Sequence, residues 1–340
     1  MHYSFLGMVV TQWTRLPPPP PADLAEKTVV IVGANTGIGL EAAKHFARMK
    51  PARLVLGARS EARGRRAIEQ IAKETGYAAE LQLIDLADFA SVQAFAARLK
   101  DDPVDVLVAN AGVAEAEFAL TKDGWERTLQ VNHLGTALLC LLLLPQLARG
   151  GALHKSHPRL VVTSSGMHMT VQLGAEYARQ PSVLRALNTP DAFARPNFPQ
   201  YSFTKLLNVL FVRALSAHLA PAAGVVPTAV CPGFCVSELR RNVSWREEVV
   251  YKLMEWTMGR SAEQGARPVV YAALGPDGRD GRHVEFFRGA YVDSCEVVGP
   301  GDWVLSREGW EMQERVWRET IEILEEVAPD VRKIVKEYLQ

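Results

Sequence analysis

The chain has few of the residues that mark disulfide-bonded, metal-binding or strongly charged proteins. Four cysteines among 340 residues are too few for a disulfide framework. Cys231 and Cys235 are spaced CxxxC, with no histidine cluster beside them that would suggest zinc. We therefore expect free thiols in a reducing, cytoplasmic compartment and no bound metal. Basic and acidic residues balance at 38 each, so no nucleic-acid partner and no disordered acidic tail are indicated.

Long apolar segments are also absent. The run ALLCLLLLPQL, residues 137–147, is too short to cross a bilayer and predicts a fully buried helix. Residues 1–16 lack the basic start and small-residue cleavage site of a signal peptide. The prolines Pro17–Pro21 that follow predict a stiff, extended spacer. We expect the segment before them to pack over the core, and contact with a membrane surface is the open alternative.

From about residue 27 to residue 233, short β-branched runs alternate with helical patterns. The predicted strands are KTVVIVGA, ARLVLGAR, AELQLIDL, VDVLVANAG, RLVVTSS and VVPTAVCPG. Strands buried on both faces and separated by helices are typical of a parallel sheet covered on both sides. The sequence therefore predicts an α/β fold, with a single doubly wound parallel sheet of Rossmann type.

One catalytic domain is expected over residues 24–308, because the alternation is continuous and the 48% apolar content is ample for one large core. An N-terminal extension, 1–23, precedes it, and a helical extension, 309–340, follows. Two stretches, 166–199 and 234–260, break the rhythm. We interpret them as lids, since long loops in an ordered domain are usually functional, and solvated excursions are the alternative.

A glycine-rich stretch, VGANTGIG, joins the first strand to the first helix. Gly33, Gly37 and Gly39 follow the pattern GxxxGxG. Their missing side chains let the turn close and let the backbone approach a pyrophosphate, which the helix N-terminus attracts. A tight structural turn is the alternative. We predict a dinucleotide site formed by Gly33, Asn35, Thr36, Gly37, Ile38 and Gly39.

The second strand ends in Gly57, Ala58 and Arg59, without the Asp or Glu that binds a free ribose 2′-hydroxyl. A guanidinium suits a 2′-phosphate in both charge and geometry. This predicts NADP(H) as the cofactor, with Arg59 on its 2′-phosphate. A surface role for Arg59 is the alternative, since the nearby segment also contains Arg63, Arg65 and Arg66.

The segment YSFTK places Tyr201 and Lys205 one turn apart on one face of a predicted helix. A neighbouring ammonium favours the phenolate and lowers the pKa of a tyrosine, which makes it usable in proton transfer near neutral pH. A YxxxK pair alone is more often structural than catalytic. Ser164 and Ser165 end the fifth strand, and only one of them can face the active side.

Taken together, these motifs resemble the short-chain dehydrogenase/reductase family, and within it the retinol-dehydrogenase-like branch. The matching elements over about residues 24–300 are GANTGIG, DL after the third strand, NAG after the fourth, VNHLG, VVTSS, YSFTK and PG after the sixth. The resemblance implies a catalytic tetrad of Asn132, Ser165, Tyr201 and Lys205. It favours Ser165 over Ser164, and it implies packing or substrate-pocket roles for His133 and His168.

The resemblance also implies further cofactor contacts. Asp85 would accept a hydrogen bond from the adenine amino group, and Ser237 would lie near the carboxamide. The implied cofactor set adds Asp85, Leu86, Asn110, Ala111, Gly112, Tyr201, Lys205, Pro232, Gly233 and Ser237 to the glycine loop and Arg59. Three positions depart from the common family pattern and weaken cofactor contacts slightly, namely Val32, Ala109 and Ser237.

The implied activity is NADPH-dependent reduction of a carbonyl in an apolar small molecule. Tyr201 would donate the proton, Ser165 would bind the developing oxyanion, and Lys205 would hold the nicotinamide ribose. Asn132 would bend its helix and position a water. An apolar substrate is expected from candidate lid residues Trp245, Tyr251, Leu253, Met254, Trp256 and Met258. The alternatives are an NAD-dependent alcohol or retinoid dehydrogenase and a non-catalytic NADP-binding regulatory protein; a homodimer would fit the family.

Overall fold

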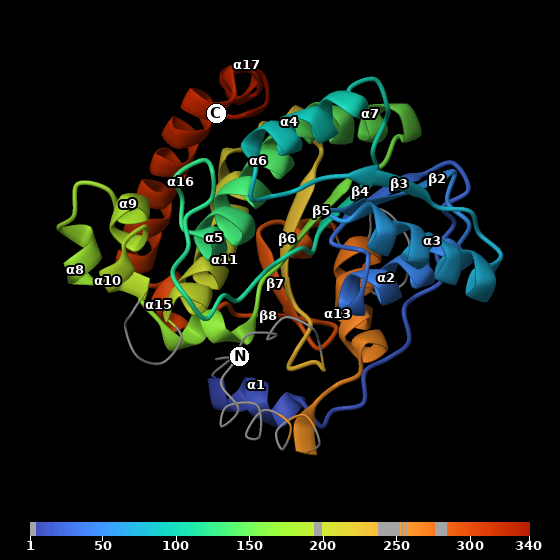
Figure 1. Ribbon diagram of the computed structural model, residues 1–340, viewed down its shortest axis with the longest axis horizontal. Helices are drawn as coiled ribbons and strands as arrows, with labels where there is room; N and C mark the ends of the chain where they lie inside the picture. Colours follow the sequence, from blue (N-terminus) through green and yellow to red (C-terminus); the bar gives the residue numbers. More distant parts are fainter. Residues whose placement is uncertain (1–4, 194–198, 237–251, 253–254, 256, 276–283) are drawn as a thin grey trace.

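The computed structural model describes residues 5–193, 199–236, 252, 255, 257–275 and 284–340, built around one mostly parallel sheet (Figure 1). The strand order is β3-β2-β1-β4-β5-β6-β7-β8, and only the pair β7–β8 is antiparallel. The strands are β1 Thr28–Val32, β2 Arg53–Ala58, β3 Glu80–Leu83, β4 Val106–Ala109, β5 Arg159–Thr163, β6 Val226–Cys231, β7 Ala290–Asp293 and β8 Glu296–Val298. The predicted doubly wound sheet is confirmed.

The sheet differs from the prediction at both edges. The strands β7 and β8 were not predicted, because AYVD and EVV are too short to show a period of their own. The expectation that every strand is buried on both faces is wrong for β3, whose residues are exposed or half-buried. This strand pairs only with β2, so it lies at the edge of the sheet, where solvent replaces one neighbour.

Helices cover both faces of the sheet, as a parallel sheet requires (Figure 1). Alternate side chains of β1 contribute to two cores, with Val29 and Ile31 in one and Val30 and Val32 in the other. The helices packed in the first core are α2 Gly37–Arg48, α3 Glu61–Thr75 and α13 Ala262–Leu274. Those in the second include α4 Phe89–Arg98, α6 Gly135–Leu142 and α11 Pro199–His218.

The long helix expected around the apolar run is broken. It consists of α5 Arg127–Leu129, a π-helical turn η1 Gln130–Leu134, then α6 and α7 Leu144–His154. Pro145, in the first turn of α7, cannot continue the preceding helix, and the axis bends by 43° there. In the described part of the chain no single helix is long and apolar enough to span a membrane, although this bent pair meets the length and composition test together. Its leucines 138–144 are buried in the core.

The remaining elements lie around this sheet. The stretch after β5 forms η2 Gly166–Thr170, α8 Ala175–Ala178, α9 Val183–Leu187 and α10 Pro190–Phe193. Shorter elements are α1 Phe5–Thr11, η3 Pro221–Ala223, α14 Val284–Phe287 and α15 Asp302–Leu305. The C-terminal segment forms α16 Arg307–Val327 and α17 Pro329–Tyr338. Helix α16 packs along α11, and the Glu319 carboxylate accepts hydrogen bonds from Val183 N and Leu184 N at the start of α9.

Candidate active site

The glycine loop after β1 requires its glycines. Gly33 has φ +87°, and a Cβ there would lie 2.6 Å from Ala111 Cα. At Gly39 a Cβ would lie 2.1 Å from the carbonyl oxygen of Gly33. Helix α2 begins at Gly37, and the Thr36 side chain makes no capping hydrogen bond in the described structure. The first turn of α2 therefore offers backbone N–H groups and a positive dipole end to an anion.

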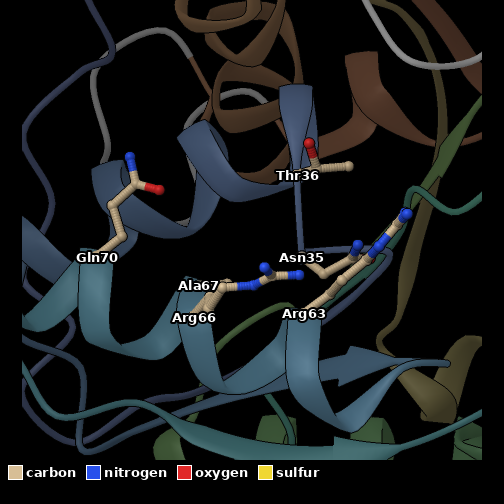
Figure 2. A pocket seen from close by; sticks show the side chains of 6 residues that line it. All are labelled: Asn35, Thr36, Arg63, Arg66, Ala67 and Gln70. Atoms are coloured by element: carbon tan, nitrogen blue, oxygen red, sulfur yellow. The ribbon is translucent and has the colours of Figure 1, made fainter.

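A cleft of about 240 Å³ lies beside this loop (Figure 2). It is lined by Asn35, Thr36, Arg63, Arg66, Ala67 and Gln70. Figure 2 shows Arg63 and Arg66 extending from α3 on the side of the loop, with Gln70 further along the same helix. Arg59, the residue that the sequence favoured for the 2′-phosphate, is exposed and does not line the cleft. Arg66 and Gln70 follow Arg63 at spacings of one and two helical turns, a periodic signal that would have found them.

The NAG segment after β4 is held against the glycine loop. Asn110 Nδ2 donates to Gly33 O at 3.1 Å, and Ala111 N donates to Val32 O at 2.9 Å. After β3, Asp85 accepts from Ala87 N at 3.0 Å, while Leu86 is buried. The predicted adenine-side residues thus lie at the carboxyl ends of β3 and β4, the edge of the sheet where doubly wound folds bind nucleotides.

Lys205 is a buried ammonium at the centre of the predicted tetrad. Its side chain is on α11, is 3% exposed, and donates from Nζ to Thr163 O at 2.9 Å. Burial lowers the pKa of Lys205 to about 8. Its Nζ also lies 5.5 Å from the centre of the Tyr201 ring, one turn earlier on the same helix and half-buried. The ammonium thus lies over the face of the Tyr201 ring.

Asn132 lies in the π-helical turn η1, where the helix is wider than an α-helix. Its Oδ1 accepts from Val113 N at 2.8 Å, and its Nδ2 donates to Val113 O at 2.8 Å and to Thr204 Oγ1 at 3.0 Å. Gly112 separates this amide from Lys205, since a Cβ on Gly112 would lie 3.3 Å from Asn132 Oδ1 and 3.4 Å from Lys205 Nζ. A side chain at that position would crowd both groups.

The two serines after β5 face different surroundings. Ser164 is buried and its Oγ donates to Lys205 O at 2.8 Å, which holds the backbone of α11. Ser165 is half-buried, and its Oγ accepts from Met167 N at 3.3 Å. Ser165 thus keeps its hydroxyl proton for another acceptor, whereas the Ser164 proton is already donated.

The two histidines near the site are both buried. His133 points toward α16, with Nε2 3.0 Å from Thr320 Oγ1, and burial lowers its pKa to about 3. His168 lies between two backbone carbonyls, with Nδ1 2.7 Å from Ser165 O and Nε2 2.7 Å from Pro300 O. Burial also lowers the pKa of His168. Both environments favour packing over proton transfer.

The turn after β6 carries the residues predicted beside the nicotinamide. This turn, Pro232–Gly233, follows β6, which pairs with β5. Lys205 Nζ is bonded to Thr163 O at the end of β5, so the turn and the ammonium lie at the ends of neighbouring strands. Gly233 has φ +84°, a conformation that favours glycine. Ser237 and the candidate lid residues other than Met258 lie outside the described residues.

The sequence matches the family described as short chain dehydrogenase over residues 27–178. The chain is 32% identical over 333 residues to the short chain dehydrogenase/reductase dmxR8 of Cryptosporiopsis sp., covering 96% of this chain and 99% of that protein. It is 34% identical over 333 residues to the short-chain dehydrogenase/reductase ffsI of Aspergillus flavipes, covering 96% of this chain and 94% of the relative.

Solved structures agree. A protein of Mycobacterium paratuberculosis superimposes with a TM-score of 0.64 at 25% identity, covering 96% of this chain and 98% of that one. Two neighbours at 22% identity carry cofactors. Actinorhodin polyketide ketoreductase was solved with NADPH (TM-score 0.56, 80% and 97% covered), and 3-ketoacyl-(acyl-carrier-protein) reductase of Brucella melitensis with NADH (TM-score 0.57, 79% and 97% covered). The chain belongs to the short-chain dehydrogenase/reductase family.

Proposed function

We propose that the protein is an NADPH-dependent reductase that converts a carbonyl of an apolar small molecule into an alcohol. The carrying observation is the grouping of three of the four tetrad residues. Lys205 is buried beside the Tyr201 ring, and Gly112, which has no side chain, lies between Lys205 and Asn132. A protein that only binds NADP does not need a phenol beside this ammonium, because it transfers no proton.

The cradle fits a dinucleotide. A Cβ at Gly33 or Gly39 would fill space that the loop needs, and the helix N-terminus behind it attracts phosphate. Arg63 and Arg66 line the adjoining cleft, and no carboxylate is among its lining residues. Two cations favour a 2′-phosphate, whereas a free ribose hydroxyl would call for an acceptor. The cofactor, when bound, supplies the hydride.

In the proposed reaction, Tyr201 donates its phenolic proton to the carbonyl oxygen while the carbonyl carbon receives the hydride. The product is the alcohol, together with the oxidised cofactor. The Lys205 ammonium favours the phenolate that remains on Tyr201. Ser165 donates its hydroxyl hydrogen bond to the oxygen as negative charge develops there. The Asn132 side chain is hydrogen-bonded to Val113 and Thr204, and it fixes the π-helical turn η1 near Lys205.

The substrate class rests on the apolar residues around this point. Val113, Met169 and Val171 are only partly buried, and they flank the Asn132 contact and the turn after Ser165. Partly exposed apolar side chains at this place favour an apolar carbonyl compound. Membership of the retinol-dehydrogenase-like branch, a cytoplasmic location and a homodimer remain predictions of the sequence.

A carbonyl panel with both cofactors tests the proposal. Loss of NADPH absorbance is measured with aliphatic, aromatic and polycyclic ketones and aldehydes, and each reaction is repeated with NADH. We expect carbonyl-dependent oxidation of NADPH, and slower oxidation of NADH. Alcohol oxidation with NAD that outpaces every reduction would favour the alcohol-dehydrogenase alternative. Tight NADPH binding without turnover of any carbonyl would favour the regulatory alternative.

A further inference from the structure

Two side chains from distant parts of the chain cover the turn Pro232–Gly233. A Cβ on Gly233 would lie 2.7 Å from Arg260 Nη1 and 3.1 Å from Gln12 Oε1. Arg260 is 3% exposed and Gln12 is 7% exposed. The turn that follows β6 is therefore in close contact with the N-terminal segment.

Hydrogen bonds connect the same groups. Phe234 N, directly after the turn, donates to Gln12 Oε1 at 2.9 Å. Arg260 Nη2 donates to Thr11 O at 2.6 Å and to Ser294 Oγ at 3.0 Å. The Arg260 guanidinium and the Gln12 amide thus connect three parts of the chain, namely the N-terminal segment, the turn after β6 and the turn after β7.

Arg260 is also fixed through its backbone. Arg260 N donates to Phe234 O at 2.9 Å, and Val236 N donates to Arg260 O at 3.0 Å. Cys235 and Arg260 are therefore paired as an isolated β-bridge beside the turn. The Arg260 side chain has little freedom to move away from Gly233.

Burial of the Arg260 guanidinium costs free energy of folding. Its Nε and Nη1 atoms are buried and find no hydrogen-bond acceptor among the described residues. A buried charge without full pairing costs free energy. An apolar residue would fill the same place without that cost, so stability alone does not account for an arginine here. What the guanidinium adds is a fork that reaches two different segments at once.

The contacts made by the N-terminal segment are of two kinds. Trp13 Nε1 donates to Thr257 O at 3.1 Å, and Leu16 is buried with its carbonyl accepting from Arg267 Nη1 at 2.7 Å. These contacts hold the segment against Thr257 and α13. The Thr11 and Gln12 contacts differ, because they are made to the turn itself and to the arginine that covers it. Helix α1 in addition lies against η2, the turn that follows Ser165.

We propose that Thr11 and Gln12 are part of the active-site architecture and, with Arg260, hold the Pro232–Gly233 turn where the nicotinamide end of the cofactor binds. This inference rests on the proposed function. Gln12 is a positioning residue, since it acts through the Phe234 amide and Gly233. A turn that is free to shift would leave the cofactor bound through its adenine and phosphate parts, while the hydride donor would be misplaced. Small displacements of this kind lower the rate of the chemical step.

The test compares two substitutions of Gln12 in the full chain. Gln12→Leu keeps the size but removes the acceptor for Phe234 N, and Gln12→Glu keeps an acceptor oxygen beside Arg260. Tyr77→Phe is the matched control, because it deletes one remote hydrogen bond, from Tyr77 Oη to Pro51 O at 2.8 Å. The measurements are kcat, KM and Kd for NADPH, the isotope effect with NADPH deuterated at the transferred position, and the melting temperature.

We expect kcat to fall about tenfold in Gln12→Leu, which corresponds to about 1.4 kcal/mol of activation free energy. The isotope effect should rise, and the Kd for NADPH should change less than threefold. Gln12→Glu should recover most of the loss, and Tyr77→Phe should lower only the melting temperature. The inference would be overturned if Gln12→Leu and Gln12→Glu had the same kcat, or if Tyr77→Phe lowered kcat as much as Gln12→Leu does.

A second variant covers the case in which Gln12→Leu does not fold. Arg260→Lys keeps the charge but cannot reach both Thr11 O and Ser294 Oγ with one planar group, so the same fall in kcat is expected. An unchanged kcat in a folded Arg260→Lys protein would count against the inference. If the wild-type protein reduces no carbonyl at all, the proposed function fails. The inference is then tested by limited proteolysis of the NADPH complex, in which Gln12→Leu should expose the turn and Gln12→Glu should not.

Discussion

Lys205 Nζ lies 5.5 Å from the centre of the Tyr201 ring and 2.9 Å from the carbonyl oxygen of Thr163. The ammonium is therefore held at the end of β5 and cannot reach solvent, while it remains close to the phenol. This arrangement explains why the YxxxK spacing matters. The helix brings the two side chains to one face, and the strand end fixes how far the cation extends.

Replacing the phenol tests the proton donor. Tyr201→Phe keeps the ring against Lys205 but removes the transferable proton. Turnover should fall by ~10²-fold or more, the scale of general-acid catalysis, while the Kd for NADPH stays within a few-fold. Steady-state kinetics and NADPH fluorescence titration measure the two effects. A variant that keeps more than a tenth of the wild-type kcat would exclude Tyr201 as the donor.

Replacing the arginines of the cleft tests cofactor choice. Arg66→Leu should raise the KM for NADPH by roughly 10- to 150-fold, since a hydrogen bond to a charged group contributes about 1.5–3 kcal/mol. The KM for NADH should hardly change. Arg65→Leu is the matched control, because Arg65 is exposed and pairs with Glu61 one turn earlier. If Arg59→Leu raised the KM for NADPH more than Arg66→Leu, the result would instead support Arg59 as the residue that binds the 2′-phosphate, as predicted from the sequence.

Burial of Lys205 should appear in the pH dependence of stability. The folded pKa of Lys205, about 8, lies below its ordinary value of 10.5. Between these pH values the unfolded chain binds the proton and the folded chain does not. The free energy of unfolding should therefore rise with pH over this window, by up to roughly 3 kcal/mol from this group. Chemical denaturation at several pH values should show that this slope is smaller in Lys205→Met. If the free energy of unfolding depended on pH in the same way in the wild-type protein and in Lys205→Met, the lowered pKa of a buried Lys205 would be contradicted.

The glycine loop should not tolerate a methyl group at its tightest point. In Gly39→Ala the new Cβ would lie 2.1 Å from Gly33 O, so the loop must shift. We expect a loss of about 1–3 kcal/mol in stability and much weaker NADPH binding. Gly174→Ala is the control, because its Cβ would meet only the end of the Glu176 side chain, at 3.1 Å. Denaturation and NADPH titration of both variants make the comparison, and normal binding by Gly39→Ala would show that the loop is not the cradle.

The amino-acid sequence alone was sufficient for the features that depend on neighbours in the chain. The β-branched runs and the helical patterns between them predicted the central strands β1, β2, β4, β5 and β6, since burial on both faces leaves a continuous apolar signal. The spacing of Gly33, Gly37 and Gly39 between a strand and a helix predicted the loop. The i, i+4 spacing of Tyr201 and Lys205 predicted a shared face.

Tertiary structure decided what depends on residues far apart in the sequence. Strand β7 is recognisable because β6 and β8 pair with it. Ser164 and Ser165 look alike in the sequence, and they are distinguished by the Lys205 carbonyl that accepts from Ser164. Arg66 rather than Arg59 lines the cleft because α3 turns toward the glycine loop. No local sequence pattern predicts the contact between Gln12 and Gly233. Hydrophobic periodicity shows which face of its own helix or strand a residue occupies. It does not show which distant segment packs against that face.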